Sequence, residues 1–201
     1  MRLKIVQAGD AVLRQRAKDV SASEIRGREI QNLIEWMRDT MHDAPGVGLA
    51  APQIGVSLRL AVIEDKPENL KEIPADYLKE RERKPVPFHV LVNPKLTLQG
   101  PAEAEFFEGC LSLAGFTAVV PRARKVRVEC LDHQGEPKII EASGWYARIL
   151  QHEIDHLDGT VYIDRMRTRT FMSVDNHSRF WKNTSSADLR KLIGWEGPAV
   201  K

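Results

Sequence analysis

His152, Glu153 and His156 are the residues whose types and spacing could do chemistry in this chain of 201 residues. Histidines four residues apart lie on one face of a helix, so both imidazoles can bind a single cation. A glutamate beside the first histidine can accept a proton from a water molecule, which completes the H-E-x-x-H arrangement of hydrolytic zinc sites. Two core histidines satisfied by hydrogen bonds are the alternative, but the glutamate in register with them makes a metal site the better interpretation.

A catalytic site of this type needs a third protein ligand and leaves one position open for water. Two candidates, Asp164 and His177, lie downstream of the histidines. Upstream, Cys110 is a better candidate, because it lies between two strand-like segments. The chain has one other cysteine. That other residue, Cys130, alternates with two valines on the inward face of a predicted strand, and we assign it to the core.

The histidines belong to a predicted helix over residues 143–159. Ser143 is placed to cap its start, and Gly159 to form a left-handed turn at its end. Trp145 and Ile149 precede the first histidine at helical spacing on the same face. Four polar residues share one narrow arc: Arg148, Gln151, Asp155 and Asp158. The other positions are nearly all apolar, so we predict a helix that is buried on most of its circumference.

A run of small residues lies upstream, at residues 46–55, and Gln53 is the side chain in it that can hydrogen bond. The run is neither a phosphate loop nor a dinucleotide turn, because the Lys-Ser/Thr ending and the third glycine are missing. Small residues allow the backbone to approach a ligand closely, and the Gln53 amide can donate a hydrogen bond. A buried amide that ties two loops together is the alternative.

The remaining pattern predicts strands in the middle of the chain. An amphipathic helix is predicted over residues 21–41, entered through a capping box of Ser21 and Glu24. Residues 64–87 are interpreted as a surface excursion without chemistry. The predicted strands cover residues 58–63, 89–92, 103–107, 118–120, 125–131 and 138–142. We therefore expect a single α+β domain in which antiparallel or mixed β-sheets pack around the buried helix.

Composition limits the class of protein and its partners. Charged residues make up 29% of the chain, the net charge is +2, and lysine and arginine are scattered, so no nucleic-acid readout is implied. Two cysteines with separate roles favour a reducing compartment and no disulfide. No apolar run approaches the roughly 20 residues of a membrane span, and no signal peptide is visible. We expect a soluble intracellular protein, either a monomer or a homodimer.

Three segments, 46–53, 108–112 and 151–156, resemble in this order and spacing the three signature motifs of peptide deformylases. The resemblance extends from about residue 5 to residue 175. Residues 143–148 and 169–175 are similar to the branch that contains the organelle deformylases of eukaryotes and their bacterial relatives.

The resemblance implies a catalytic domain over residues 1–175, with residues 176–201 as a polar C-terminal extension of the same domain. It implies a hydrolase that removes the formyl group from the formylmethionine of nascent chains, with transient contact to the ribosome. A bacterial-type cytoplasmic enzyme is expected rather than an organelle form, because no transit peptide is evident.

The resemblance also assigns roles to single residues. The metal ligands would be Cys110, His152 and His156, holding Fe²⁺ in the native enzyme, with Zn²⁺, Ni²⁺ or Co²⁺ in purified protein. Glu153 would accept the proton of the attacking water and pass it to the departing amine. Charge on the formyl oxygen would be stabilised by the Gln53 amide and the backbone N–H of Leu111, together with the metal.

The methionine side chain requires an apolar slot beside the metal. Six residues are expected to line it: Val47, Gly48, Phe106, Glu108, Trp145 and Ile149. For the last two, packing in the core is the alternative. Arg122 is expected to pair with Glu108. Thr117 stands where many bacterial members have an arginine that contacts the substrate backbone, so recognition of the peptide backbone is expected to differ there.

Two other classes of protein remain. A zinc endopeptidase would share the helix and Glu153, but its third ligand should lie downstream. A closed structural site would need a fourth protein ligand. Two further histidines, His133 and His177, do not have ligand spacing to the others.

Overall fold

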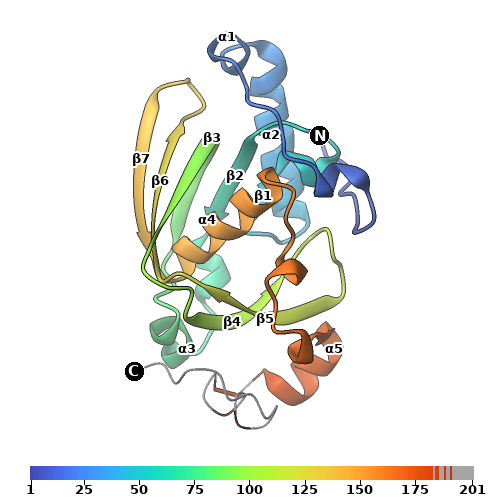
Figure 1. The fold of residues 1–201 in the computed structure, drawn as a ribbon, viewed down its shortest axis with the longest axis vertical. Helices are drawn as coiled ribbons and strands as arrows, with labels where there is room; N and C mark the ends of the chain where they lie inside the picture. Colours follow the sequence, from blue (N-terminus) through green and yellow to red (C-terminus); the bar gives the residue numbers. More distant parts are fainter. Residues whose placement is uncertain (183, 186–187, 189–190, 192–201) are drawn as a thin grey trace.

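The helix that carries both histidines, α4 (Gly144–Leu157), contacts two antiparallel β-sheets (Figure 1). The computed structural model describes residues 1–182, 184–185, 188 and 191. In it α4 crosses one face of a five-stranded sheet, and Arg148 connects the helix to a smaller three-stranded sheet by hydrogen bonds to backbone carbonyl groups. The predicted α+β domain, with sheets packed around a buried helix, is therefore confirmed.

The five-stranded sheet supplies most of the core. Its strands lie in the order β1 (Gly48–Ala50), β2 (Leu60–Asp65), β3 (Val86–Gln99), β6 (Lys125–Leu131) and β7 (Pro137–Ser143). Alternate residues of β6 face the core, and Cys130 is 7% exposed, which confirms its assignment. Strand β3 is longer than the predicted segment because a bulge at Asn93, where φ is 50°, interrupts the alternation of side chains without ending the strand.

The smaller sheet consists of β4 (Ala104–Gly109), β5 (Phe116–Arg122) and the short β8 (Met172–Ser173). Strands β4 and β5 pair in a register that places Phe106 opposite Val120 and Glu108 opposite Ala118. The chain leaves β4 at Gly109, so Cys110 lies directly at the end of a strand.

The predicted helix over residues 21–41 is two helices, α1 (Ala22–Ile25) and α2 (Arg28–Asp43). The capping box of Ser21 and Glu24 is confirmed, because each side chain bonds the other's backbone N–H. The prediction of one helix was wrong because the first helix ends before Gly27, which caps the second one. The apolar face of α2 packs on β2 and β3.

The amphipathic pattern of α4 predicts that its polar arc faces solvent. In the structure most of this arc is buried. Arg148, Gln151 and Asp155 are 3%, 4% and 6% exposed, and Asp158 is the exposed member. The Gln151 amide pairs with both backbone groups of Ala123. Polar partners from the smaller sheet and its connections therefore replace solvent on this side of α4.

The ends of α4 follow the prediction in part. Ser143 occupies the N-cap position, but its side chain makes no capping hydrogen bond. Gly159 has a φ of 75°, the left-handed turn expected after the helix.

The excursion between β2 and β3 contains α3 (Ala75–Glu80) and a 3₁₀ turn at Pro67–Leu70. Further short turns lie at Ala11–Arg14, Ala51–Ile54, Tyr162–Asp164 and Thr168–Thr170. After β8 the chain forms α5 (Val174–Asn176) and a π-helical turn at His177–Trp181. Within the described part of the chain, no helix combines the length and the hydropathy that crossing a bilayer requires.

Candidate active site

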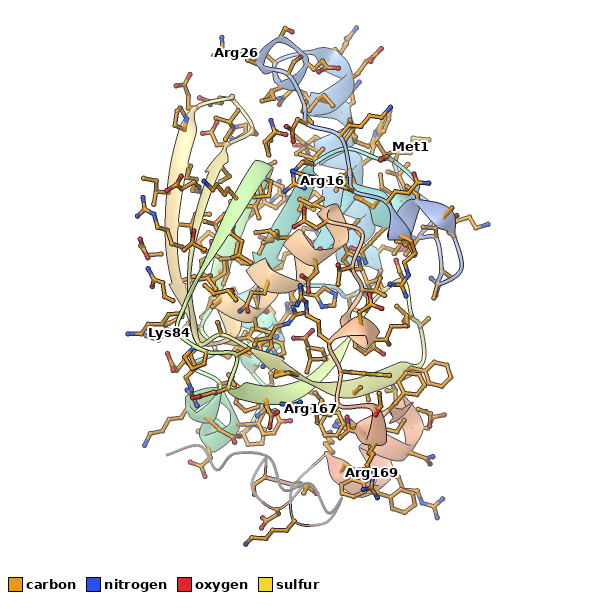
Figure 2. All side chains as sticks on the ribbon, viewed as in Figure 1. Met1, Arg16, Arg26, Lys84, Arg167 and Arg169 are labelled. Carbon is orange, nitrogen blue, oxygen red and sulfur yellow. The ribbon has the colours of Figure 1, made fainter. Side chains whose placement is uncertain are left out.

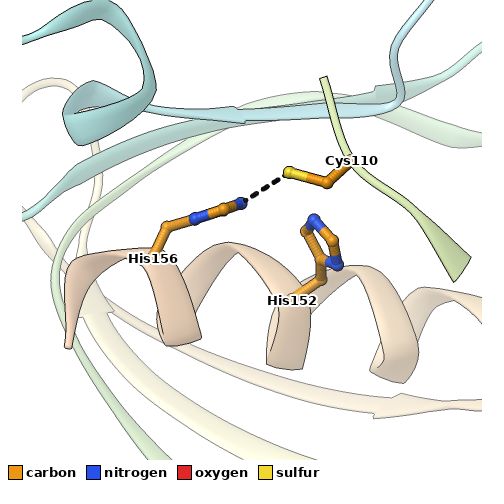
Figure 3. Close-up of side chains that lie close together, drawn as sticks. All are labelled: Cys110, His152 and His156. Carbon is orange, nitrogen blue, oxygen red and sulfur yellow. Dashed lines mark hydrogen bonds between the residues drawn. The ribbon is translucent and has the colours of Figure 1, made fainter. Parts of the chain in front are cut away.

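Cys110, His152 and His156 meet between the end of β4 and the C-terminal half of α4 (Figure 3). One ligand atom from each residue lies within 4.8 Å of the others, and Cys110 Sγ is 3.2 Å from His156 Nε2. Ligands that bind one ion at about 2.0–2.3 Å are about 3–4 Å apart. The donor set of one sulfur and two nitrogens therefore fits a single divalent ion such as iron, zinc, nickel or cobalt.

The other proposed ligands lie elsewhere. Asp164 pairs with Arg14 and accepts a hydrogen bond from the backbone of Val161. The ring of His177 packs against Phe107, with 4.4 Å between the ring centroids. Among the residues that the structure describes, the trio of Cys110 and the two α4 histidines is the one group arranged to hold a metal ion.

Two hydrogen-bond donors face the sulfur of Cys110. The backbone N–H of Ser112 lies 3.4 Å from Sγ, and the Gln53 amide nitrogen lies 3.5 Å from it. The segment after β4 thus folds back so that its own backbone supports the sulfur.

Glu108 is the centre of a buried ion-pair network behind the two histidines (Figure 2 draws all described side chains of the molecule). Its carboxylate accepts two hydrogen bonds of 3.0 Å from Arg122 and one of 2.5 Å from Arg148, and it lies 3.0 Å from His152 Nδ1. Burial opposes its ionisation, but the charges of Arg122 and Arg148 outweigh burial and hold the pKa of Glu108 well below its usual range. The expected pair with Arg122 is confirmed, and Glu108 also reaches the cavity described below.

The same network extends away from the site. Arg122 also donates a hydrogen bond of 2.5 Å to Asp155. Arg165 donates one hydrogen bond to each carboxylate oxygen of Asp155, both at 2.8 Å. Burial lowers the pKa of His156 well below the usual value of a histidine, and the nearby His152 adds to this effect. The lowered pKa favours the neutral ring, which is the form of imidazole that binds a metal.

Glu153 is buried beside the trio and packs against β1. It is 4% exposed, and its Oε2 atom has no hydrogen-bond partner among the described residues. Burial raises the pKa of Glu153 to about 7. A Cβ atom on Gly48 would overlap the Glu153 carboxylate, so glycine at this position makes room for it.

The Gln53 side chain lies between the end of β1 and the segment that carries Cys110. Its Oε1 accepts a hydrogen bond of 2.8 Å from the backbone N–H of Ala50, and its amide nitrogen faces Cys110 and the hydroxyl of Ser112, at 3.4 Å from the latter. The side chain thus ties two loops together and directs its donor at the site. Leu111 lines the cavity beside it, and its carbonyl accepts a hydrogen bond from Gln7.

A cavity of about 410 Å³ opens next to Cys110, His152 and Glu153. Five of the six residues expected to form the methionine slot line it: Val47, Gly48, Glu108, Trp145 and Ile149. Ile149 is 3% exposed, so it belongs to the core and to the cavity wall at once. Gln53 and Leu111 also line this cavity.

Phe106 is not among the residues that line this cavity, and its contact with a substrate stays a prediction. Its ring lies under the guanidinium groups of Arg81 and Arg148, at 4.4 and 5.2 Å. Phe106 shares a face of β4 with Glu108, but two residues along a strand separate them by several ångströms. Thr117 is buried and donates its hydroxyl to the carbonyl of Glu108, so it does not face a ligand.

Phe116 and Val174 are among the wall residues that were not predicted. Phe116, at the start of β5, and Val174, after β8, lie at the cavity and are about half exposed. Phe116 follows closely on the segment of Cys110, so its position in the sequence could have indicated it. Val174 comes from a distant segment, which the pairing of β8 with β5 brings to the site.

The polypeptide deformylase family model matches residues 2–171. The chain belongs to this family. It is 51% identical over 172 residues to peptide deformylase 1A, chloroplastic, of Solanum lycopersicum, a match that covers 86% of this chain and 62% of the relative. It is 45% identical over 200 residues to peptide deformylase 1 of Streptomyces coelicolor, a match that covers 98% of this chain and 89% of the relative. The chain therefore spans less than two thirds of the tomato relative's length.

The fold agrees with solved deformylases. A Synechococcus elongatus peptide deformylase in complex with actinonin has 38% sequence identity and a TM-score of 0.68, over 82% of this chain and 79% of that one. A deformylase from Acinetobacter baumannii has 32% identity and a TM-score of 0.72, over 83% of this chain and 99% of that one. The resemblance to deformylases, including organelle forms and bacterial relatives, is thus confirmed.

Proposed function

We propose that this chain is a metal-dependent hydrolase that removes the N-formyl group from the N-terminal formylmethionine of peptides. Family membership supports the reaction class. The observation that carries the proposal is the position of Cys110, which lies beside His152 and His156 while Glu153 faces the same apolar cavity. An endopeptidase with a third ligand downstream would not need the cysteine there.

Cys110, His152 and His156 would hold one divalent ion. When bound, such an ion lowers the pKa of water and stabilises negative charge on an oxygen. The donor types suit iron, zinc, nickel and cobalt alike, and we propose iron(II) as the native ion, as the family resemblance implies. A thiolate beside iron is sensitive to oxygen, which moves cysteine up the oxidation ladder, so activity should decay in air.

The protein's own groups would then do the proton transfer and charge stabilisation. Glu153 accepts the proton of the attacking water and returns it to the departing amine, a role for which its unpartnered Oε2 is available. The Gln53 amide, held by Ala50, and the backbone N–H of Leu111 stabilise the charge that develops on the formyl oxygen. Glu108 keeps the ring of His152 in place.

The first residue of the substrate would occupy the slot between Val47, Trp145 and Ile149. This wall is apolar and suits an unbranched thioether side chain. The solved relative from Acinetobacter baumannii is described as bound to Met-Ala-Ser, a peptide that begins with methionine.

Residues 1–175 would form the catalytic domain, and residues 176–201 a polar extension of it. Residues 183, 186–187, 189–190 and 192–201 of that extension lie outside the described part of the structure. We further propose that the substrates are nascent chains met during transient contact with the ribosome. The proposed setting is the cytoplasm of a bacterial-type cell, where the protein acts as a monomer or homodimer.

Release of formate from formyl-Met-Ala-Ser, measured beside formyl-Ala-Ala-Ser and unformylated Met-Ala-Ser, tests this function. We expect formate and intact Met-Ala-Ser as products, with the formyl-Met peptide preferred. Cleavage of an internal peptide bond, with no formate released, would instead support an endopeptidase.

A further inference from the structure

Arg83 lies in the excursion between β2 and β3, a segment without predicted chemistry, and its guanidinium is 4.9 Å from the centroid of the Trp145 ring. Trp145 begins the face of α4 that leads to the histidines, and it lines the cavity with Val47 and Ile149. A cation at this distance from an indole ring is attracted to it. The excursion therefore reaches the wall of the proposed slot through the Arg83 side chain.

Arg83 is held rigidly on its other side. Its Nε and Nη2 atoms donate to the two oxygens of Asp65, at 2.8 and 3.1 Å. Asp65 ends β2 and is fully buried, and Asn69 donates a further hydrogen bond of 3.1 Å to it. Such a two-pronged pair fixes the plane of the guanidinium as well as its position. Arg83 thus links the core of the large sheet to the Trp145 ring.

The turn that carries Arg83 also packs closely against the start of α4. A Cβ atom on Gly144 would overlap the Glu82 side chain and lie 2.7 Å from the carbonyl oxygen of Arg81. Glu82 has a φ of 49°, and its carboxylate pairs with Arg124 at 3.1 Å. The turn and the first residues of α4 therefore keep a fixed relative position.

Trp145 has few other polar restraints. Its indole Nε1 is buried and makes no hydrogen bond within the described part of the chain. The orientation of the ring therefore depends on packing and on the cation beside it, because no hydrogen bond from the indole N–H restrains it.

We propose that Arg83 is a positioning residue for Trp145, so that the excursion sets the width of the apolar slot and with it the selectivity for the first residue of the substrate. This inference rests on the proposed function, because it concerns the same slot. Arg83 does not touch the reacting atoms. Its loss should change the affinity for the methionine side chain and leave proton transfer by Glu153 intact.

Kinetics of Arg83→Ala with formyl-Met-Ala-Ser and formyl-Ala-Ala-Ser test the proposal. We expect KM for the formyl-Met peptide to rise about tenfold and the preference for methionine over alanine to fall by a similar factor, while kcat stays within about twofold. Arg83→Lys keeps a cation near the ring and should restore part of the preference. Lys84→Ala, an exposed neighbour, is the matched control and should behave like the parent protein.

The ratio of kcat/KM for two substrates does not depend on the fraction of active protein, so a role in stability alone would leave it unchanged. Removing Arg83 leaves Asp65 buried without its cation, which can prevent folding. The double substitution Asp65→Asn with Arg83→Gln removes both charges together and should show the same loss of preference. An unchanged preference in either folded variant would overturn the proposal.

Two measurements do not require turnover. The indole N–H resonance of Trp145, assigned from its loss in Trp145→Phe, should shift in Arg83→Ala and stay in place in Lys84→Ala. The affinity for Met-Ala-Ser, measured by calorimetry, should fall about tenfold in Arg83→Ala. If the parent protein released no formate from any peptide, the proposed function would fail, and these two measurements would still decide the role of Arg83. An unmoved resonance with unchanged affinity would refute it.

Discussion

Glu108 Oε2 lies 3.0 Å from His152 Nδ1, which leaves the other ring nitrogen of His152 to face Cys110 and His156. Two buried arginines, Arg122 and Arg148, keep this carboxylate ionised. A carboxylate behind a ligating histidine fixes its tautomer and its ring orientation. The ion-pair network therefore supports the proposed metal site as well as the core.

Glu108→Gln should weaken metal binding about 10–100-fold, because the amide cannot hold His152 as the carboxylate does. It should also destabilise the fold by about 3–5 kcal/mol, since two buried guanidinium groups lose their counter-charge. Chelator competition and thermal unfolding measure the two effects. Glu129→Gln, at an exposed position, is the control. Metal affinity within twofold of the parent would show that His152 does not depend on Glu108.

Glu153→Gln should keep the metal and lose turnover by several orders of magnitude, because an amide of the same size cannot accept a proton. Metal content by elemental analysis and formate release provide the two readouts. Activity within tenfold of the parent would remove Glu153 from the role of base.

Gly48→Ala should lower kcat about 100-fold without loss of metal, because the added Cβ displaces the Glu153 carboxylate. A double-mutant cycle with Glu153→Gln identifies the cause. If Gly48 acts through Glu153, the double variant should be no slower than Glu153→Gln alone. A further large loss in the double variant would mean that Gly48 acts on another group.

Gln53→Ala should reduce kcat by about 10²–10³, the usual cost of one donor to a developing oxyanion. Thermal unfolding of the same variant measures the separate contribution of its hydrogen bond to Ala50. A kcat within threefold of the parent, with reduced stability, would leave Gln53 the structural role alone.

The sequence predicted the parts of the site that local spacing determines. His152, Glu153 and His156 follow from helical periodicity, and α4 brings them to one point as expected. Cys110 was predicted from its place between strands and from the resemblance, and in the structure its sulfur lies beside His156. Segments with strong periodicity, such as β6, were also found with their bounds.

Long-range pairing of polar groups could not be predicted in the same way. Arg148 resembles a solvent-facing residue by helical pattern, but its partner Glu108 is 40 residues away in the chain. Arg83 belongs to a charged segment that looks like surface, because nothing local shows that Asp65 is fully buried beside it. The contact of Phe106 with Arg81 is likewise long-range, and helical or strand spacing could not indicate it.

Titration of iron(II) into the metal-free protein under anaerobic conditions, with formate release from formyl-Met-Ala-Ser followed at each step, tests the central claim most directly. Cys110, His152 and His156 are proposed to hold one ion on which the reaction depends. Activity should rise linearly to one equivalent of iron per chain and then level off, and Cys110→Ala should bind iron poorly and release little formate. Formate release by the metal-free protein at the parent's rate, or an increase that continues past one equivalent, would contradict the account.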